Sequence, residues 1–123
     1  MLPKILVIDD SPLVRQFLKL GLSQLPATCD DAPNGREGLS KIASAKYDLV
    51  FCDINMPVLD GLSFLAELKT QPGAPPVVMV TTEGATDEQQ RASQLGAAFY
   101  LTKPVQLPKL LEVARRLLAT STG

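Results

Sequence analysis

Residues 4–12 read KILVIDDSP, and three structural signals follow one another in this stretch without a gap. Ile5–Ile8 is an apolar run rich in β-branched side chains, which predicts a strand buried on both faces. The acidic pair Asp9-Asp10 ends the run. Ser11 then offers a capping hydroxyl, and Pro12 takes the first helical position, where a missing N–H group costs nothing. The stretch therefore predicts a buried strand that leads directly into a helix.

The same pair of segments, a short apolar run and a longer amphipathic one, recurs along the rest of the chain. Strands are predicted at about 5–8, 28–31, 49–52, 77–80 and 98–101, and all but the second are expected to be buried on both faces. Helices are predicted at about 12–25, 36–45, 62–68, 87–95 and 108–119. Five strands alternating with five helices predict an α/β fold, in which helices cover both faces of a parallel sheet. Right-handed crossovers and the chain length favour the doubly wound strand order 2-1-3-4-5.

The composition limits the classes of function. The chain has 123 residues and a mass of 13.2 kDa, the size of one domain. Its 12 Lys+Arg and 13 Asp+Glu give a net charge of −1, so the basic excess that nucleic-acid binding requires is absent. No apolar run has the length of a signal-peptide core or a membrane span. We therefore expect a cytoplasmic location and a protein that binds neither nucleic acid nor membrane.

The side chains available for chemistry are also restricted. The chain has no histidine and only two cysteines, Cys29 and Cys52. The missing histidine excludes histidine-based acid–base catalysis, histidine-activated nucleophiles and histidine-ligated metals. Two cysteines cannot build a disulfide framework or a four-cysteine zinc site. Carboxylates, hydroxyls, lysine and a bound metal ion remain.

Polar residues follow the predicted strands at positions that one edge of a parallel sheet gathers together: Asp9, Asp10, Asp53, Thr81, Thr82 and Lys103. Each alone has a structural explanation, such as capping the next helix, but together they form a charged cluster. Two carboxylates about 4 Å apart repel by about 4 kcal/mol at an effective dielectric constant of 20, so the cluster needs positive charge. Lys103 supplies one charge, and an all-oxygen ligand set favours Mg²⁺. Such a site is suited to phosphoryl transfer, with a carboxylate as the nucleophile.

Four segments in order resemble the signature motifs of the response-regulator receiver family: IDDS at 8–11, DINMPVLDG at 53–61, VTTE at 80–83 and YLTKP at 100–104. The similarity extends over essentially the whole chain, to about Ala119, and is strongest to the stand-alone, CheY-like members. It implies a flavodoxin-like, doubly wound fold. It also implies a single receiver domain over 1–123, folded to about 119 with a short C-terminal tail and no output domain.

The resemblance implies a role for each acidic residue of the cluster. Asp53 is expected to be the phosphoacceptor and a ligand of Mg²⁺. Asp10 is expected to bind the ion directly, and Asp9 mainly through water. The backbone carbonyl of Asn55 is the fourth expected ligand.

The resemblance also implies a switch around the phosphoryl group. Thr81 is expected to hydrogen-bond the phosphoryl oxygens and Lys103 to pair with them. Tyr100 is expected to change rotamer as Thr81 moves, and Pro104 to follow a cis peptide bond. Thr82 is larger than the residue usual at its position, so it is expected to narrow access for the phosphoryl group. Glu83 and Asn55 match the CheY-like pattern, and these positions tune the phosphoryl lifetime, so we expect a short one.

The implied function is that of a signalling module with weak self-catalysed phosphotransfer and dephosphorylation, not a classical enzyme. Since the chain has no histidine, the phosphoryl group would come from a partner histidine kinase or phosphotransfer protein. A separate target protein would bind at the face formed by the fourth helix, fifth strand and fifth helix. Both chemotaxis-type signalling and a phosphorelay fit the motifs.

Two alternatives stay open at this point. A receiver-like interaction module that works without phosphorylation usually lacks a key acid or the lysine, and none is missing here. A phosphatase of the haloacid-dehalogenase type also uses an aspartate nucleophile at a strand end. That class places a second aspartate two residues later, where this chain has Asn55, and usually needs a cap for which 123 residues leave little room.

Overall fold

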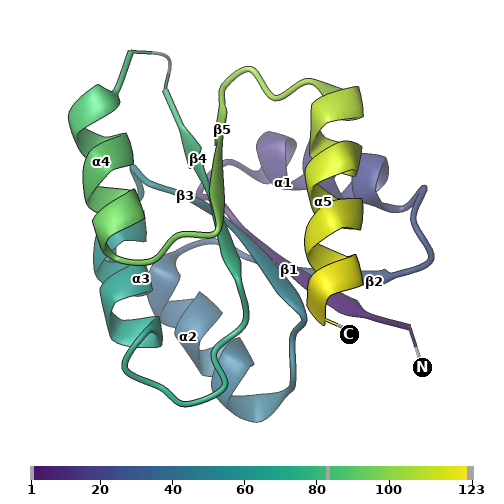
Figure 1. The fold of residues 1–123 in the computed structure, drawn as a ribbon, viewed down its shortest axis with the longest axis horizontal. Coiled ribbons are helices and arrows are strands. Elements are labelled where there is room, and N and C mark those ends of the chain that lie inside the picture. The colour runs from purple at the N-terminus through teal and green to yellow at the C-terminus, as the bar shows by residue number, and fades with distance from the viewer. Residues whose placement is uncertain (1, 83, 122–123) are drawn as a thin grey trace.

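The computed structural model describes residues 2–82 and 84–121 and contains a five-stranded parallel sheet with the order β2-β1-β3-β4-β5, as predicted. The strands are β1 (Lys4–Ile8), β2 (Thr28–Ala32), β3 (Leu49–Asp53), β4 (Val77–Thr81) and β5 (Phe99–Thr102). The helices are α1 (Pro12–Leu22), α2 (Gly35–Ser44), α3 (Gly61–Leu68), α4 (Thr86–Gln94) and α5 (Leu107–Ser121). Helices α1 and α5 lie on one face of the sheet, and α2, α3 and α4 lie on the other (Figure 1).

Two apolar clusters hold these three layers together. Along β1, Leu6 and Ile8 face the cluster under α2 and α3, while Ile5 and Val7 face the cluster under α1 and α5. All four side chains are at most 1% exposed. Burying an aliphatic side chain of this size stabilises a fold by about 1.5–3 kcal/mol, so both faces of the central strands contribute. This explains why β1 and β3 are continuous apolar runs and not alternating ones.

The register of the sheet brings the ends of the central strands to one level. Ile8 of β1 pairs with Cys52 of β3, so Asp9 and Asp53 follow at neighbouring positions. Thr81 at the end of β4 pairs with Thr102 of β5, directly before Lys103. The carboxyl edge of the sheet therefore collects the polar residues that end the strands, which is where parallel α/β sheets place their functional sites.

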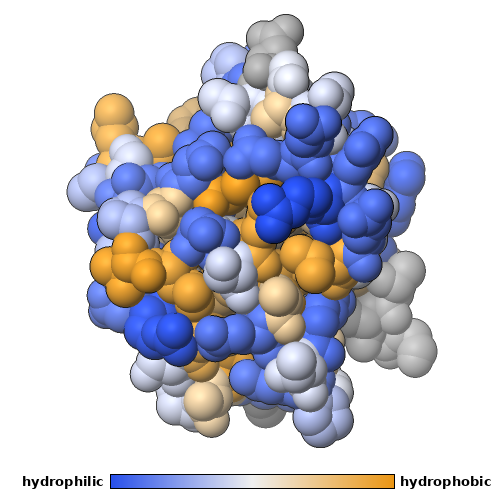
Figure 2. All heavy atoms as spheres, turned by 90° about the vertical axis from the view of Figure 1, so that its left-hand side faces the viewer, coloured by the Kyte–Doolittle hydropathy of each residue, from blue (hydrophilic) through white to orange (hydrophobic). Residues whose placement is uncertain are grey.

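Short side chains start three of the helices. Ser11 accepts a hydrogen bond from the Val14 N–H group at 3.3 Å and begins α1, as predicted. Asn34 and Asp60 cap α2 and α3 in the same way, at 2.9 and 2.8 Å. Helix α4 has no side-chain hydrogen bond at its N-cap, Ala85, and buries only Ala92. From the side of α3 and α4, the surface is largely hydrophilic, with hydrophobic side chains gathered in small patches (Figure 2).

The structure differs from the predicted elements in the end of the first helix and in the burial of the fifth strand. Asp53 and Thr81 are the last residues of β3 and β4, within the approximate predicted bounds, whereas α1 ends at Leu22, three residues before its predicted end. The expected burial of the fifth strand on both faces is wrong, because only Leu101 of β5 is buried. Phe99 and Tyr100 are 40% and 41% exposed, since β5 is an edge strand that the neighbouring helices cover incompletely.

No helix in the described part of the chain combines the length and the apolar character that crossing a bilayer requires.

Gly61 provides a test of the close packing between the loop at residues 54–60 and the end of β3. A Cβ atom at Gly61 would overlap the Asp53 carbonyl oxygen and lie 2.7 Å from the Ile54 Cα atom, and neither is a flexible side-chain tip. We expect Gly61→Ala to lower the free energy of unfolding by about 3 kcal/mol, measured by urea denaturation. Gly73→Ala is the control. Gly73 has open space around it, so an added Cβ atom meets no neighbour, and the substitution costs only the strain of placing alanine at a positive φ, about 1 kcal/mol. Equal losses in the two variants would contradict this account.

Candidate functional site

An acidic cluster lies at the carboxyl edge of the sheet. Oxygen atoms of Asp9, Asp10 and Asp53 all lie within 4.8 Å of one another. Asp9 is 1% exposed and Asp53 is 6% exposed, whereas Asp10 is exposed. Two of the three negative charges are thus largely withdrawn from water, which makes their mutual repulsion stronger.

Lys103 supplies positive charge to the cluster. Its Nζ atom lies 3.3 Å from Asp9 Oδ2 and 3.3 Å from Asp53 Oδ2. Lys103 directly follows β5, and its backbone N–H group donates to the Thr81 carbonyl at 2.7 Å. The residue therefore connects the acidic cluster to the end of β4. One ammonium group facing three carboxylates leaves the cluster with excess negative charge.

The two oxygens of Asp9 have different surroundings, and the difference tests whether a metal ion fits here. Oδ1 accepts a hydrogen bond from the Ser11 N–H group at 2.9 Å. Oδ2 is buried and has no hydrogen-bond partner, although the Lys103 ammonium lies 3.3 Å away. A buried carboxylate oxygen without a donor, beside two further carboxylates, fits a hard divalent cation such as Mg²⁺. Asp9, Asp10 and Asp53 are the side chains that could hold it.

Burial and the excess negative charge both affect the pKa values of Asp53 and Lys103. Burial raises the pKa of Asp53, and the neighbouring charge of Asp9 raises it further. The Lys103 ammonium and the Asn55 N–H group lower the pKa of Asp53 without cancelling the rise. For Lys103, burial lowers the pKa, but the two carboxylates outweigh burial and the net pKa is raised. The site therefore favours additional positive charge.

Thr81 is 1% exposed, and its hydroxyl group is already engaged. It donates to the Leu101 carbonyl at 3.5 Å and accepts from Gln89 Nε2 at 3.4 Å, both at the long end of the hydrogen-bond range. The hydroxyl is thus directed toward β5 and α4. The structure places Thr81 at the expected strand end but does not give it a hydrogen bond to Asp53.

The other predicted site residues lie around this centre. Asn55 and Thr82 are exposed, and Glu83 lies outside the described residues. Tyr100 is partly exposed and stacks on Phe99, with ring centroids 6.1 Å apart. The Lys103–Pro104 peptide bond is cis, as the resemblance implies.

Two residues that contact the site were missed by the sequence analysis. Arg15 donates to the Asp9 carbonyl at 2.7 Å, and Gln89 donates to Thr81. Arg15 could have been noticed, because it lies three and seven residues before the buried Leu18 and Leu22, within the apolar stripe of α1. Gln89 carries no comparable signal, since α4 is polar almost throughout.

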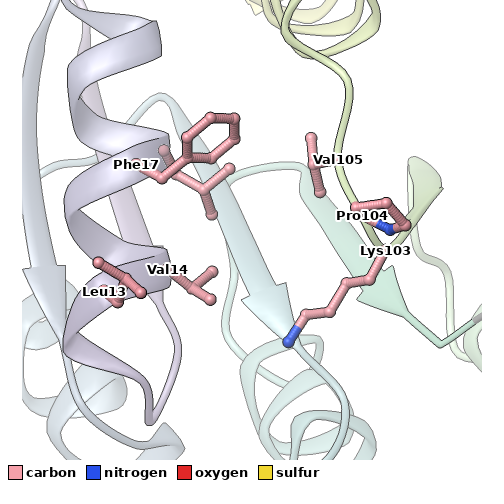
Figure 3. Close-up of a pocket in the computed structure, with 7 residues that line it drawn as sticks. Leu13, Val14, Phe17, Lys103, Pro104 and Val105 are labelled. Atoms are coloured by element: carbon pink, nitrogen blue, oxygen red, sulfur yellow. The ribbon is translucent and has the colours of Figure 1, made fainter.

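An apolar groove of about 620 Å³ adjoins the site between α1 and the segment after β5. Its lining comes from those two segments: Leu13, Val14, Phe17, Leu18, Lys103, Pro104 and Val105. In Figure 3, Val14 and Phe17 on α1 face Pro104 and Val105 across the groove, and the Lys103 side chain extends along it. Lys103 therefore belongs to both the groove and the acidic cluster.

The response regulator receiver domain family matches residues 5–115. The chain belongs to this family. The transcriptional regulatory protein QseB of Haemophilus influenzae is 37% identical over 116 residues, which cover 94% of this chain and 51% of QseB. The chemotaxis protein CheY of Halobacterium salinarum is 32% identical over 112 residues, which cover 91% of this chain and 93% of that protein.

A solved structure shares the fold. The chemotaxis response regulator CheY4 of Vibrio cholerae is 32% identical to this receiver domain and superimposes with a TM-score of 0.87, covering 95% of this chain and 99% of that one. The chain spans about half the length of QseB and of the response regulator MprA of Mycolicibacterium vanbaalenii, but most of the length of the CheY relative. Receiver domains are phosphoacceptor modules of two-component signalling.

The raised pKa of Asp53 predicts a pH-dependent effect on stability. Because the folded protein binds the Asp53 proton more tightly than the unfolded chain does, the free energy of unfolding falls as pH rises above the ordinary value of 3.8. Without divalent cations at pH 7, we expect Asp53→Asn to be more stable than the wild type by about 1–2 kcal/mol. The gain should shrink as pH falls toward that ordinary value.

The measurement is urea denaturation in a chelating buffer over a series of pH values. Asp60→Asn is the matched control, because Asp60 is exposed and asparagine caps a helix as well as aspartate does. A wild type more stable than Asp53→Asn at neutral pH would rule out this description of the site.

Proposed function

We propose that this receiver domain accepts a phosphoryl group on Asp53 from a phosphohistidine of a partner protein and then changes its binding to a separate target protein. The observation that carries the proposal is the position of Asp53. Its carboxylate lies within the acidic cluster and 3.3 Å from the Lys103 ammonium, at the open edge of the sheet. A carboxylate nucleophile, a lysine and an oxygen-lined cation site are together what phosphoryl transfer requires.

In the transfer step, an Asp53 oxygen attacks the phosphorus atom and forms a P–O bond. The P–N bond to the donor imidazole breaks, and the imidazole keeps the electron pair and takes a proton. The product on Asp53 is an acyl phosphate. Lys103, 3.3 Å from Asp53, would pair with a phosphoryl oxygen and reduce the repulsion between the phosphoryl group and the acids. Asp10, Asp53 and the Asn55 carbonyl would bind Mg²⁺, with Asp9 acting through water, and the ion would neutralise charge on the phosphoryl oxygens.

Phosphorylation would change the hydrogen bonding of Thr81. A hydroxyl group has one proton to donate, and Thr81 gives it to the Leu101 carbonyl. Donation to a phosphoryl oxygen would therefore end that contact and weaken the contact with Gln89. Gln89 lies on α4 and Leu101 lies on β5, so a local change at the site would reach both of these elements.

The target would bind the face formed by α4, β5 and α5. Phe99 and Tyr100 of β5 are partly exposed there, and Lys109 of α5 lies 5.3 Å from the centre of the Phe99 ring. Exposed aromatic side chains beside a cation are typical of protein interfaces. Tyr100 would change rotamer when Thr81 turns toward the phosphoryl group, which would alter this face.

The donor would dock on the apolar groove beside α1. A phosphohistidine must come within bonding distance of Asp53, and Lys103 lines the groove while contacting Asp53. A donor helix seated on the groove would therefore bring its histidine to the open edge of the acidic cluster. Leu13 and Phe17 are 76% and 48% exposed and would supply apolar contact.

Labelling of Asp53 tests the proposed function directly. The chain is incubated with acetyl phosphate and Mg²⁺, and its intact mass is measured. We expect the wild type to gain one phosphoryl group that hydroxylamine removes, as an acyl phosphate requires. Asp53→Asn and a chelated sample should gain none, Lys103→Met should gain it at least about tenfold more slowly, and Asp60→Asn should behave as the wild type. Full labelling of Asp53→Asn would refute the assignment.

Two leucines of α1 provide a matched test of the docking groove. Leu13 and Leu20 are 76% and 74% exposed, but only Leu13 lines the groove. With the catalytic core of a histidine kinase that phosphorylates the wild type, we expect Leu13→Ser to slow transfer about tenfold, the effect of losing one interface anchor of about 1.4 kcal/mol. Leu20→Ser should leave transfer unchanged. Acetyl phosphate should label both variants at the wild-type rate, and an equal defect with both phosphoryl donors would speak against docking.

A further inference from the structure

Arg15 is a charged residue in a largely buried position. It lies on α1, and its side chain is only 17% exposed. Its Nη1 atom donates to the Asp9 carbonyl at 2.7 Å, and its Nε atom donates to Asp31 Oδ2 at 2.8 Å. The guanidinium group thus connects α1, the residue after β1 and the edge strand β2. Both contacts are short, and each involves a charged group, which makes them stronger than ordinary hydrogen bonds.

Asp31 accepts a hydrogen bond from Arg15 and a second one from Lys19. Lys19, one turn further along α1, donates to Asp31 Oδ1 at 3.2 Å, so the two oxygens of Asp31 have separate cationic partners. Burial opposes ionisation of Asp31, but the two hydrogen bonds outweigh burial and lower its pKa. Asp31 is therefore ionised at neutral pH and orients the guanidinium plane.

The backbone of Asp9 is fixed by several independent contacts. Its N–H group donates to the Ala32 carbonyl at 3.1 Å, and its side chain accepts from the Ser11 N–H group. Arg15 adds the contact to the Asp9 carbonyl. That carbonyl belongs to the peptide unit that leads to Asp10. Because a peptide unit is planar, fixing its oxygen fixes the direction in which the chain enters Asp10.

Asp10 depends on this backbone more than the other acids do. Asp9 and Asp53 each contact the Lys103 ammonium. Within residues 2–82 and 84–121, no hydrogen bond or ion pair to the Asp10 carboxylate is found, and Asp10 is exposed. Its presence within 4.8 Å of the other two acids therefore rests on the backbone that carries it.

We propose that Arg15 is a positioning residue for the acidic cluster: through the Asp9 carbonyl it sets the direction of Asp10 and so the affinity of the cluster for a divalent cation. The proposal deepens the proposed function and rests on it only in that the cluster binds Mg²⁺. Residues that orient the ligands of a metal site typically change metal affinity by about 10–100-fold when they are replaced.

A positioning role and simple electrostatics predict opposite changes in the cation affinity of the cluster when Arg15 is replaced. Arg15 carries a positive charge near the acidic cluster, so by Coulomb's law alone its removal would strengthen the binding of a cation. If Arg15 positions the acids, its removal weakens binding despite the lost repulsion. The charge-conserving change Arg15→Lys separates the two effects further, since lysine lacks the planar fork that bridges two acceptors at once.

The test is an Mg²⁺ titration of the full chain, followed by backbone-amide NMR at residues 9–10 and 53. We expect the dissociation constant to rise about tenfold in Arg15→Met and at least threefold in Arg15→Lys. Arg115→Met, at an exposed arginine of α5, is the charge-matched control and should match the wild type. Urea denaturation of each variant establishes that it is folded at the temperature of the titration.

The outcomes are distinguishable. Unchanged or tighter Mg²⁺ binding in folded Arg15→Met would overturn the proposal and leave a purely structural role for Arg15. If Arg15→Met does not fold, Arg15→Lys decides, and a wild-type dissociation constant there would also overturn it. A wild type that binds no Mg²⁺ and is not labelled by acetyl phosphate would instead refute the proposed function itself.

Discussion

Repulsion among three carboxylates at one edge of the sheet is the constraint around which this receiver domain is built. Asp9 and Asp53 are almost fully buried, and oxygens of both lie within 4.8 Å of one another and of Asp10. Two such charges about 4 Å apart cost about 4 kcal/mol at an effective dielectric constant of 20, and Lys103 offsets only part of this. Burial raises the pKa of Asp53, and the repulsion from Asp9 raises it further. A site with unbalanced negative charge and a buried unpartnered oxygen is prepared for a cation.

The apolar sheet makes this arrangement possible. The central strands are buried on both faces, so their backbones are held firmly and their ends lie at one level. Less firmly packed elements surround the site. Helix α4 has no side-chain cap and buries only one residue, and β5 is an edge strand with two partly exposed aromatic side chains. The central strands thus carry the acids, while α4 and β5, which would respond to phosphorylation, have fewer packing contacts to break.

Much of this organisation could be predicted from the sequence. The alternation of apolar runs and amphipathic segments predicted the parallel sheet, right-handed crossovers and the chain length favoured its strand order, and the polar strand ends predicted the acidic cluster. The burial of β5 was predicted wrongly from its apolar run, although the predicted strand order already placed this strand at the edge of the sheet, where helices cover a strand incompletely. Arg15 stands out in the sequence only as a charged residue within the apolar stripe of α1, and that position does not reveal that its partner is the backbone carbonyl of Asp9. The end of α1 was predicted three residues too late, because Leu25 continues the apolar pattern and packs in the same apolar cluster although it lies beyond the helix.

Local sequence patterns were sufficient to predict the helices and strands, their order along the chain and the residue types at the strand ends. Periodicity, capping and apolar runs depend on residues that are close in the chain. The geometry of the site needed the folded molecule. The two contacts of Lys103, the unpartnered oxygen of Asp9 and the groove beside α1 join segments far apart in sequence. The bridge from Arg15 to Asp9 and Asp31 is of the same kind. Such contacts depend on the sheet register and on how each helix packs, and these arise only when the whole chain buries its two apolar clusters together.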